Sequence, residues 1–384
     1  MQGLQAHLAA WLILLPSCSC LAFNTATKAP STVALYSNEA LEGLEFSKFP
    51  EPAQQLAATD GGPPRWLYRA TQTLFGLVQA SPLYPALKRK AIQKMKAASE
   101  AAGAEWDQTV SELAGECDDA ALALFVKDSG VTTPEYYVRP FHAYDEGNMN
   151  WEAACEQTVA SAGVGAAQFP GLPAPDGEER FRGAFDRELL DLLPADALAR
   201  QPGAALVDLG CGTGTSARRL LSIFPQAASC IGFDLSPHMA LIGKALQRRA
   251  ADAADERLEI RYGDAARTGL ADSSVDLVSL CLIMHELPAA ASHDILAEAC
   301  RVLKPGGHLA IFEMDPLSPG YSKIRASPLL FAIVRSTEPY LDEYFFDVAP
   351  VLDEYLAAAG LQMTGKRLIE SNKHQVVLAT KLSS

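Results

Sequence analysis

The sequence predicts a doubly wound α/β fold, preceded by a largely helical N-terminal unit. After residue 204, apolar β-rich segments alternate with helical patterns, and a glycine-rich turn follows the first of these segments. Acidic residues end several of the predicted strands. Helices between parallel strands cover both faces of a sheet, and such connections are right-handed. Ligands of such sheets bind beyond the carboxyl ends of the strands, so the acidic strand ends are the first candidates for function.

The first 40 residues are predicted to be a presequence and not part of the fold. Residues 1–22 contain no Asp, Glu, Lys or Arg, and residues 8–16 form an apolar run too short to span a bilayer. Phe23 follows a small-residue junction, and residues 23–37 are rich in hydroxyl groups and lack acids. This pattern resembles the signal-plus-transit presequences of algae with secondary plastids, which implies delivery to a plastid (chloroplast). The alternative is ordinary secretion.

Residues 41–163 are predicted to form an N-terminal helical unit, and the Gly- and Pro-containing residues 164–176 a linker. The segment 136–151 mixes aromatic, ionisable and amide side chains just before a predicted helix at roughly 151–162. Two interpretations of this segment stay open. It is either a well-bonded helix entry or a lid that faces a ligand.

Residues 204–215, AALVDLGCGTGT, predict a strand, a tight turn and the start of a helix. The glycines let the backbone take positive φ and pass close to a ligand, and the helix start presents unpaired N–H groups there. A dinucleotide fold needs G-x-G-x-x-G, whose third glycine packs the helix. Here the pattern is G-x-G-x-G, and Thr215 takes the place of that third glycine. An acid, Asp208, stands two residues before the first glycine.

Further strands are predicted at residues 230–234, 258–262 and 275–280, and from the Pro-Gly-Gly turn at 305–307 to residue 312. Asp234 ends the second strand, where a carboxylate can accept two ribose hydroxyls. Dinucleotide folds place a similar acid, so Asp234 alone does not choose between families.

These elements, in this order, resemble the class I S-adenosylmethionine (SAM)-dependent methyltransferases over residues 177–384. The resemblance implies a Rossmann-like sheet of seven strands with a last antiparallel strand at residues 374–380. It also implies SAM as the cofactor, with its methionine part over the glycine loop, its ribose on the second strand's acid and its adenine near the third strand's end. The implied cofactor-binding residues are Asp208, Gly210, Cys211, Gly212, Gly214, Asp234, Leu235, Asp264, Ala265 and Leu282.

The segments 141–151 and 336–344 resemble something narrower, uncharacterised plastid methyltransferases akin to those that act on prenylquinones. This resemblance implies a small, apolar acceptor of the quinol or phenol type. A base is needed only if the acceptor must lose a proton. The candidate catalytic residues are His285, which titrates near neutrality when unperturbed, and His142 and Tyr144, which could close the site from the N-terminal unit. A structural role for His285 stays open, and Glu286 is expected to cap or pair locally.

The overall composition argues against several other classes of function. The formal net charge is −14, whereas a phosphate-binding surface needs clustered Lys and Arg, so nucleic acid is not an expected partner. The six cysteines after the presequence show no C-x-x-C pair and no zinc-like spacing, so no metal site is predicted. No transmembrane segment is expected in the mature chain, and peripheral membrane contact stays open. The functional alternatives are a protein methyltransferase and a non-catalytic SAM-binding protein.

Overall fold

A computed structural model describes residues 63–79, 84–127, 129–142, 144–249 and 255–382. The predicted presequence, residues 1–40, lies outside the described residues. Among the described residues, no helix combines the length and the apolar character that crossing a membrane requires.

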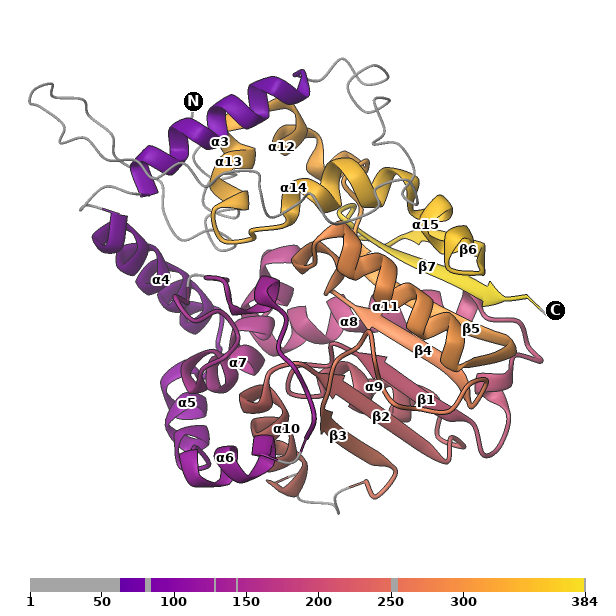
Figure 1. Ribbon diagram of the computed structural model, residues 1–384. Helices are drawn as coiled ribbons and strands as arrows, with labels where there is room; N and C mark the ends of the chain where they lie inside the picture. The colour runs from indigo at the N-terminus through magenta and orange to yellow at the C-terminus, as the bar shows by residue number, and fades with distance from the viewer. Residues whose placement is uncertain (1–62, 80–83, 128, 143, 250–254, 383–384) are drawn as a thin grey trace, which may run out of the picture.

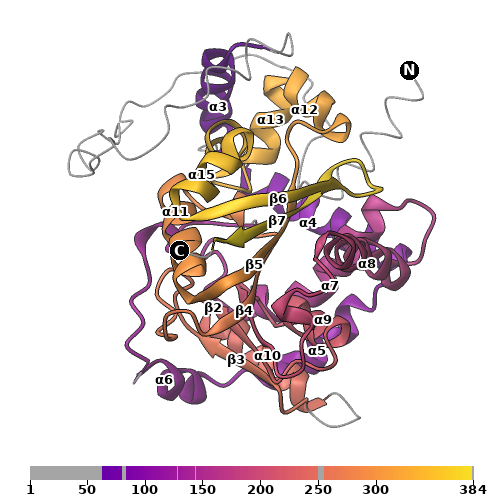
Figure 2. The ribbon, with the colours of Figure 1, turned by 90° about the vertical axis from the view of Figure 1, so that its right-hand side faces the viewer.

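The centre of the protein is a seven-stranded sheet in the order β3-β2-β1-β4-β5-β7-β6 (Figures 1 and 2). Neighbouring strands from β3 to β5 are parallel, and β7 runs antiparallel to both β5 and β6. The strands are β1 (Ala205–Leu209), β2 (Ser229–Asp234), β3 (Leu258–Tyr262), β4 (Val275–Cys281), β5 (Leu303–Met314), β6 (Leu361–Leu368) and β7 (His374–Lys381). This sheet confirms the predicted doubly wound fold with a last antiparallel strand. Its strand order reverses between β1 and β4, where such folds bind ligands.

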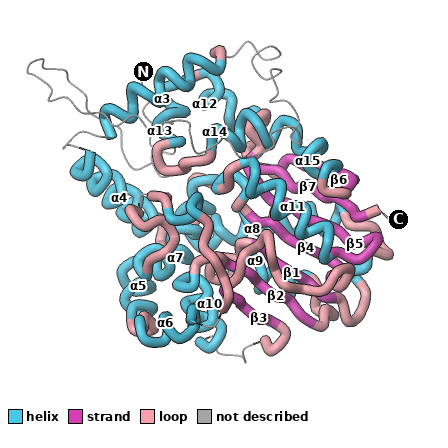
Figure 3. Tube along the Cα trace, in the orientation of Figure 1, coloured by secondary structure: helices cyan, strands magenta, loops and turns pink. Residues whose placement is uncertain are grey.

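Helices cover both faces of the sheet (Figures 2 and 3). Side chains that alternate along β1 pack in opposite directions. Leu206 joins a core with α8 and α9, and Val207 and Leu209 join a core with α11 and α15. The helices after β1 are α9 (Thr215–Ile223), α10 (Pro237–Arg249), α11 (Ala289–Val302), α12 (Ser322–Ala326), α13 (Pro328–Arg335), α14 (Leu341–Glu343) and α15 (Leu352–Ala358).

In the described part of the chain, six α-helices precede the sheet, and several of them pack on it or on its later helices. Tyr68 of α3 packs against Phe331 of α13, with ring centroids 5.3 Å apart. The side chains of α5 and α7 share an apolar cluster with Met239 and Ile242 of α10. The helices are α3 (Arg65–Gln79), α4 (Tyr84–Ala101), α5 (Trp106–Ala114), α6 (Asp119–Lys127), α7 (Trp151–Gln168) and α8 (Ala174–Leu192).

The predicted linker, residues 164–176, is mostly helical in the structure. Residues 164–168 complete α7 and residues 174–176 begin α8, so only residues 169–173 connect the two helices. Gly165, one of the residues that suggested a linker, instead lets α7 touch α8, and Gly177 of α8 does the same from the other side. A Cβ on Gly165 would lie 2.4 Å from the Cα of Glu178, and one on Gly177 would lie 2.5 Å from the Cα of Ala166. The division into two units by this segment stays a prediction.

Candidate functional site

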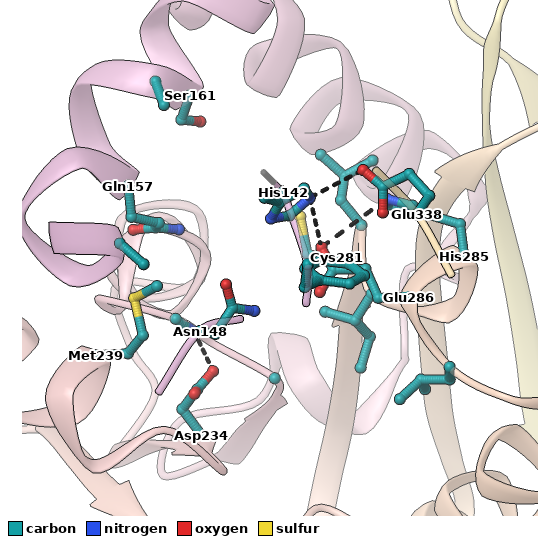
Figure 4. Close-up of a pocket in the computed structure, with 18 of the residues that line it drawn as sticks. His142, Asn148, Gln157, Ser161, Asp234, Met239, Cys281, His285, Glu286 and Glu338 are labelled. Carbon is teal, nitrogen blue, oxygen red and sulfur yellow. Dashed lines mark hydrogen bonds and ion pairs between the residues drawn. The ribbon is translucent and has the colours of Figure 1, made fainter. Parts of the chain in front are cut away.

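A cavity of 780 Å³ lies at the carboxyl ends of the central strands (Figure 4). Its floor is the glycine loop between β1 and α9 together with the ends of β2 and β4. Its walls come from α7, from α8 and from residues 135–150, which we call the cap segment and of which residue 143 lies outside the described residues. The volume is typical of a small-molecule site.

The glycine loop takes a backbone path that requires glycine. Gly210, Gly212 and Gly214 have φ values of 72°, 55° and 85°, which place them in the left-handed region. A Cβ on Gly210 would lie 2.8 Å from the side chain of Ile283, and one on Gly212 would lie 2.8 Å from the Nε2 of Gln157. The loop can therefore keep this path against Ile283 and Gln157 only with glycine at these positions.

Asp234 faces the cavity from the end of β2 (Figure 4). Its Oδ2 accepts a hydrogen bond from the amide of Gly212 at 2.7 Å, and its Oδ1 accepts one from the amide of Ser236 at 2.8 Å. The hydroxyl of Tyr137, in the cap segment, lies 3.4 Å from Oδ1 and donates to it only weakly. Burial raises the pKa of Asp234, while the two amides oppose that rise. The carboxylate is thus oriented by the backbone and keeps acceptor sites open to a ligand hydroxyl.

Asp208 lies beneath the glycine loop and does not line the cavity. It is fully buried, and its Oδ2 accepts a hydrogen bond of 2.5 Å from the hydroxyl of Ser216 in α9. Burial raises its pKa to about 6. Asp208 therefore ties the end of β1 to the start of α9, and its implied role in cofactor binding stays a prediction.

The other predicted cofactor residues divide by their position relative to the cavity. Gly214 packs beneath it, where a Cβ would lie 2.5 Å from the side chain of Ile260. Asp264 bonds the amide of Ala266 at 2.9 Å through Oδ1 and lines the cavity. Those that line it are Gly210, Cys211, Gly212, Asp234, Leu235, Asp264, Ala265 and Leu282.

His285 is held as a buried cation. Its Nδ1 lies 2.8 Å from the Oε1 of Glu313, a fully buried side chain on β5, and its backbone amide donates to the Oε2 of the same residue at 3.2 Å. Although burial opposes the charged form, the carboxylate of Glu313 raises the pKa of His285 to about 10. A general base must accept a proton at neutral pH, so this pairing does not suit the base predicted at His285. It suits a fixed positive charge.

His142 lies between two carboxylates that line the cavity (Figure 4). Its Nε2 is 3.1 Å from the Oε1 of Glu338 and 3.5 Å from the Oε1 of Glu286. The Nε2 of His285 is 3.9 Å from the same Glu286 oxygen. We call these four residues, His142, His285, Glu286 and Glu338, the acid–base cluster. Among the described residues, no group of His, Cys, Asp and Glu side chains is arranged to hold a metal ion.

Glu286 is the member of the acid–base cluster that titrates near neutrality. Burial raises its pKa to about 7, against the opposite effect of the charges on His142 and His285. The carboxylates of Glu338 and Glu286 raise the pKa of His142, whose side chain is 40% exposed, above the ordinary value. The structure therefore places Glu286 beside the imidazoles of His142 and His285. The sequence suggested only local pairing for it.

Tyr144 lines the cavity from the cap segment, and its hydroxyl donates a hydrogen bond to Glu156 of α7. Burial raises the pKa of Tyr144, and the negative charge of Glu156 raises it further, so the hydroxyl keeps its proton. Its contact with an acceptor stays a prediction.

A family model described as a methyltransferase domain matches residues 207–311, which run from β1 into β5. The chain carries a methyltransferase domain. The domain belongs to the class I SAM-dependent methyltransferases, which confirms the predicted family, fold class and cofactor.

Three relatives illustrate what the methyltransferase domain is similar to. The ubiquinone/menaquinone biosynthesis C-methyltransferase UbiE of Dinoroseobacter shibae is 37% identical over 129 residues, which are 33% of this chain and 50% of that protein. The demethylmenaquinone methyltransferase of Beutenbergia cavernae is 34% identical over 154 residues, which are 38% of this chain and 58% of that protein. The mitochondrial 2-methoxy-6-polyprenyl-1,4-benzoquinol methylase of Caenorhabditis elegans is 29% identical over 155 residues, which are 40% of this chain and 48% of that protein. The chain spans about half the length of these curated relatives.

Arg182 in the wall of the methyltransferase cavity was missed by sequence reasoning. This α8 side chain is only 8% exposed, donates to the hydroxyl of Ser161 at 2.6 Å and pairs with Glu178. An arginine on a helix ordinarily lies in solvent, and only the crossing of α7 and α8 buries this one. Glu338 was also missed, because its place beside His142 depends on contacts between distant segments.

Proposed function

We propose that this protein transfers a methyl group from SAM to a small, apolar acceptor of the quinol or phenol class. The observation that carries the proposal is a single cavity that joins the glycine loop and Asp234 to the acid–base cluster. The relatives described above are named for methylation of quinone or quinol compounds, which supports this class of acceptor.

The residues at one end of the cavity suit SAM. Asp234 would accept the ribose hydroxyls, because its carboxylate faces the cavity and the Tyr137 hydroxyl holds it only weakly. Arg182 would meet the cofactor's carboxylate, since it is a buried cation in the cavity wall. Gly210 and Gly212 line the cavity without a side chain, so the loop backbone could approach the cofactor closely. When bound, SAM supplies an electrophilic methyl group that is already activated by the sulfonium charge.

The other end of the cavity suits an acceptor that must lose a proton. Glu286 would take that proton, because its pKa of about 7 leaves a substantial fraction of carboxylate at neutral pH. The cation at His285 would stabilise negative charge that develops on a phenolic oxygen. An aromatic acceptor could also pack against aromatic side chains that line the same cavity, which are Phe141, Tyr321 and Tyr340.

We also propose that the protein contacts a membrane surface, where prenylated acceptors reside. Large apolar side chains are exposed at one end of the molecule, on α3 and on α13, which pack together (Figure 1). They are Trp66, Leu74, Leu77 and Leu329, which are 66%, 65%, 61% and 59% exposed. A group of exposed apolar side chains on adjoining helices is typical of a docking surface. Flotation of the purified protein with vesicles should be lost in a Trp66→Ser, Leu74→Ser double variant. Retained flotation would refute this contact.

Delivery to a plastid remains part of the proposal and rests on residues 1–40 alone. A fluorescent fusion of residues 1–50 should enter plastids, and Phe23→Ala should impair entry. Secretion of the fusion would refute it.

The central experiment incubates the purified protein with methyl-labelled SAM and separate prenylated quinol, simple phenol and protein-extract substrates. Label should transfer to the quinol or phenol. Transfer only to protein would make the chain a protein methyltransferase. SAM binding without transfer to any of these substrates would leave a SAM-binding protein.

A further inference from the structure

Two cysteine side chains face one another where the N-terminal helices meet. Cys117 follows α5 and is partly exposed, and Cys155 lies near the start of α7 and is only 3% exposed. Their Sγ atoms are 3.5 Å apart, and both thiols are free in this structure. A disulfide has an S–S length of about 2.05 Å, so the two atoms must approach by about 1.5 Å to bond.

The chain between these cysteines contains the whole cap segment. In that segment Tyr137 donates to Asp234, and the carbonyl of Asn148 accepts a hydrogen bond of 2.6 Å from the hydroxyl of Ser236. The helix that carries Cys155 also contacts the glycine loop, because Thr158 lies 3.3 Å from the hydroxyl of Thr213. A disulfide between the two cysteines would therefore close a covalent loop that contains the cap segment.

We propose that Cys117 and Cys155 form a reversible disulfide that restrains the cap segment over the cavity. The bond confines the loop from residue 117 to residue 155, so it reduces the conformational freedom of any state in which the cap has opened. The cap contacts Asp234 and Ser236 through Tyr137 and Asn148, so a ligand that bonds Asp234 must displace the Tyr137 contact as it enters or leaves. Oxidation thus favours the closed cavity and slows exchange.

The chemistry is a thiol–disulfide exchange with a small disulfide as the oxidant. Cys117 is the accessible thiol, so its thiolate attacks the small disulfide, forms a mixed disulfide and releases one small thiolate. Cys155 then loses its proton and attacks the Cys117 sulfur, which releases the second small thiolate. Two protons leave the protein thiols, and two electrons reduce the small disulfide. Burial raises the pKa of Cys155 to about 12, so the buried thiol does not make the first attack.

The test oxidises the full chain with oxidised glutathione and maps its peptides without reduction. A peptide that links Cys117 to Cys155 should appear, and dithiothreitol should remove it. Hydrogen exchange of residues 135–150 should slow by about tenfold in the oxidised protein and recover on reduction. Neither measurement needs a cofactor or methyl transfer, so this result is independent of the proposed function.

Two variants make the test specific. Cys117→Ser should abolish the linked peptide and the change in hydrogen exchange. Cys300→Ser removes a partly exposed thiol on α11 and should leave both unchanged. A stable glutathione adduct on Cys117 with no linked peptide would overturn the proposal, and so would a linked peptide with unchanged exchange of residues 135–150.

Discussion

The two ends of the cavity differ in how the chain builds them. At the end that holds Asp234, the side chains and amides come from short stretches directly after β1 and β2. At the end that holds the acid–base cluster, His142 comes from the cap segment, His285 and Glu286 follow β4, and Glu338 follows α13. The first end is built mainly by the strand–turn–helix segments that contain β1 and β2, and α8 adds Arg182. The second depends on how three distant segments pack.

This difference also separates binding from chemistry in the proposed function. Changes at the first end should alter cofactor affinity and leave the proton chemistry intact. Changes at the second end should alter turnover and its pH dependence and leave cofactor affinity nearly constant. The predictions below test that separation, beginning with the largest expected effect.

Glu286→Gln should lower turnover by about 10²–10⁴-fold, because an amide cannot accept the acceptor's proton. The turnover of the unchanged protein should rise with pH through about 7, where Glu286 loses its proton, and the variant should lose that rise. Steady-state rates between pH 5.5 and 8.5 measure both effects. The matched control is Glu338→Gln, which removes the other carboxylate beside His142. Equal loss in the two variants would assign the effect to the charge of the cluster and not to a base at Glu286.

Glu313→Gln should lower the free energy of unfolding by about 3–5 kcal/mol at pH 6, because it leaves His285 buried without its charged partner. The pKa of His285 is raised in the folded protein to about 10, so its pairing stabilises fully below the unfolded value of about 6.5. That contribution is lost as the pH rises through 10. The difference in free energy of unfolding between the unchanged protein and Glu313→Gln should therefore become smaller. Urea unfolding at pH 6, 8 and 10 measures it.

The control for this stability effect is Glu370→Gln, which removes exposed ion pairs with Arg180 at 2.8 Å and with Arg187 at 3.3 Å. Exposed pairs contribute little to stability, so this variant should unfold almost as the unchanged protein does. A loss of similar size in both variants would contradict the special role of the buried pair.

Asp234→Ala should weaken SAM binding by about 1.5–3 kcal/mol per lost charged hydrogen bond, or at least about tenfold. Calorimetric titration measures the affinity, and a thermal melt checks the fold. Because Asp234 also orients the amide of Gly212, Asp234→Asn serves as the milder variant that keeps one acceptor oxygen. Unchanged affinity in a folded Asp234→Ala protein would remove the assignment of this end of the cavity to the cofactor.

The same contrast explains what the sequence could predict. Asp234, Asp264 and the three glycines follow predicted strands within a few residues, so local pattern located them. The partnership of His142 with Glu338 has no local signal, because it forms only when α13 packs beside the cap segment. Gly165 led to the prediction of a linker where the structure has a helix. In the sequence alone, a glycine that lets two helices pack closely cannot be told from a glycine in a linker.

The charge on His285 was likewise beyond sequence reasoning. Its near-neutral ordinary pKa made His285 a candidate for the base. The fully buried carboxylate of Glu313 on β5 raises that pKa, which argues against the role. The effect follows from a partner in a neighbouring strand, and the residues beside His285 in the chain give no sign of it.

The smallest expected effect, and the sharpest test of the second end, comes from comparing His142→Ala with Tyr144→Phe. His142 is one of the two cations that lower the pKa of Glu286. Its removal should therefore move the midpoint of the pH–rate profile above about 7. Tyr144 lies in the same segment, but its hydroxyl donates to Glu156 and not to the acid–base cluster.

Tyr144→Phe should therefore leave the midpoint unchanged and cost about 1 kcal/mol of stability from its lost hydrogen bond. Both variants should bind SAM within a few-fold of the unchanged protein, because neither residue bonds Asp234 or the glycine loop. A midpoint shift in Tyr144→Phe alone would move the proton chemistry from Glu286 toward Glu156. A shift in neither would mean that His142 does not control the ionisation of Glu286, and the cap segment would then be only a cover.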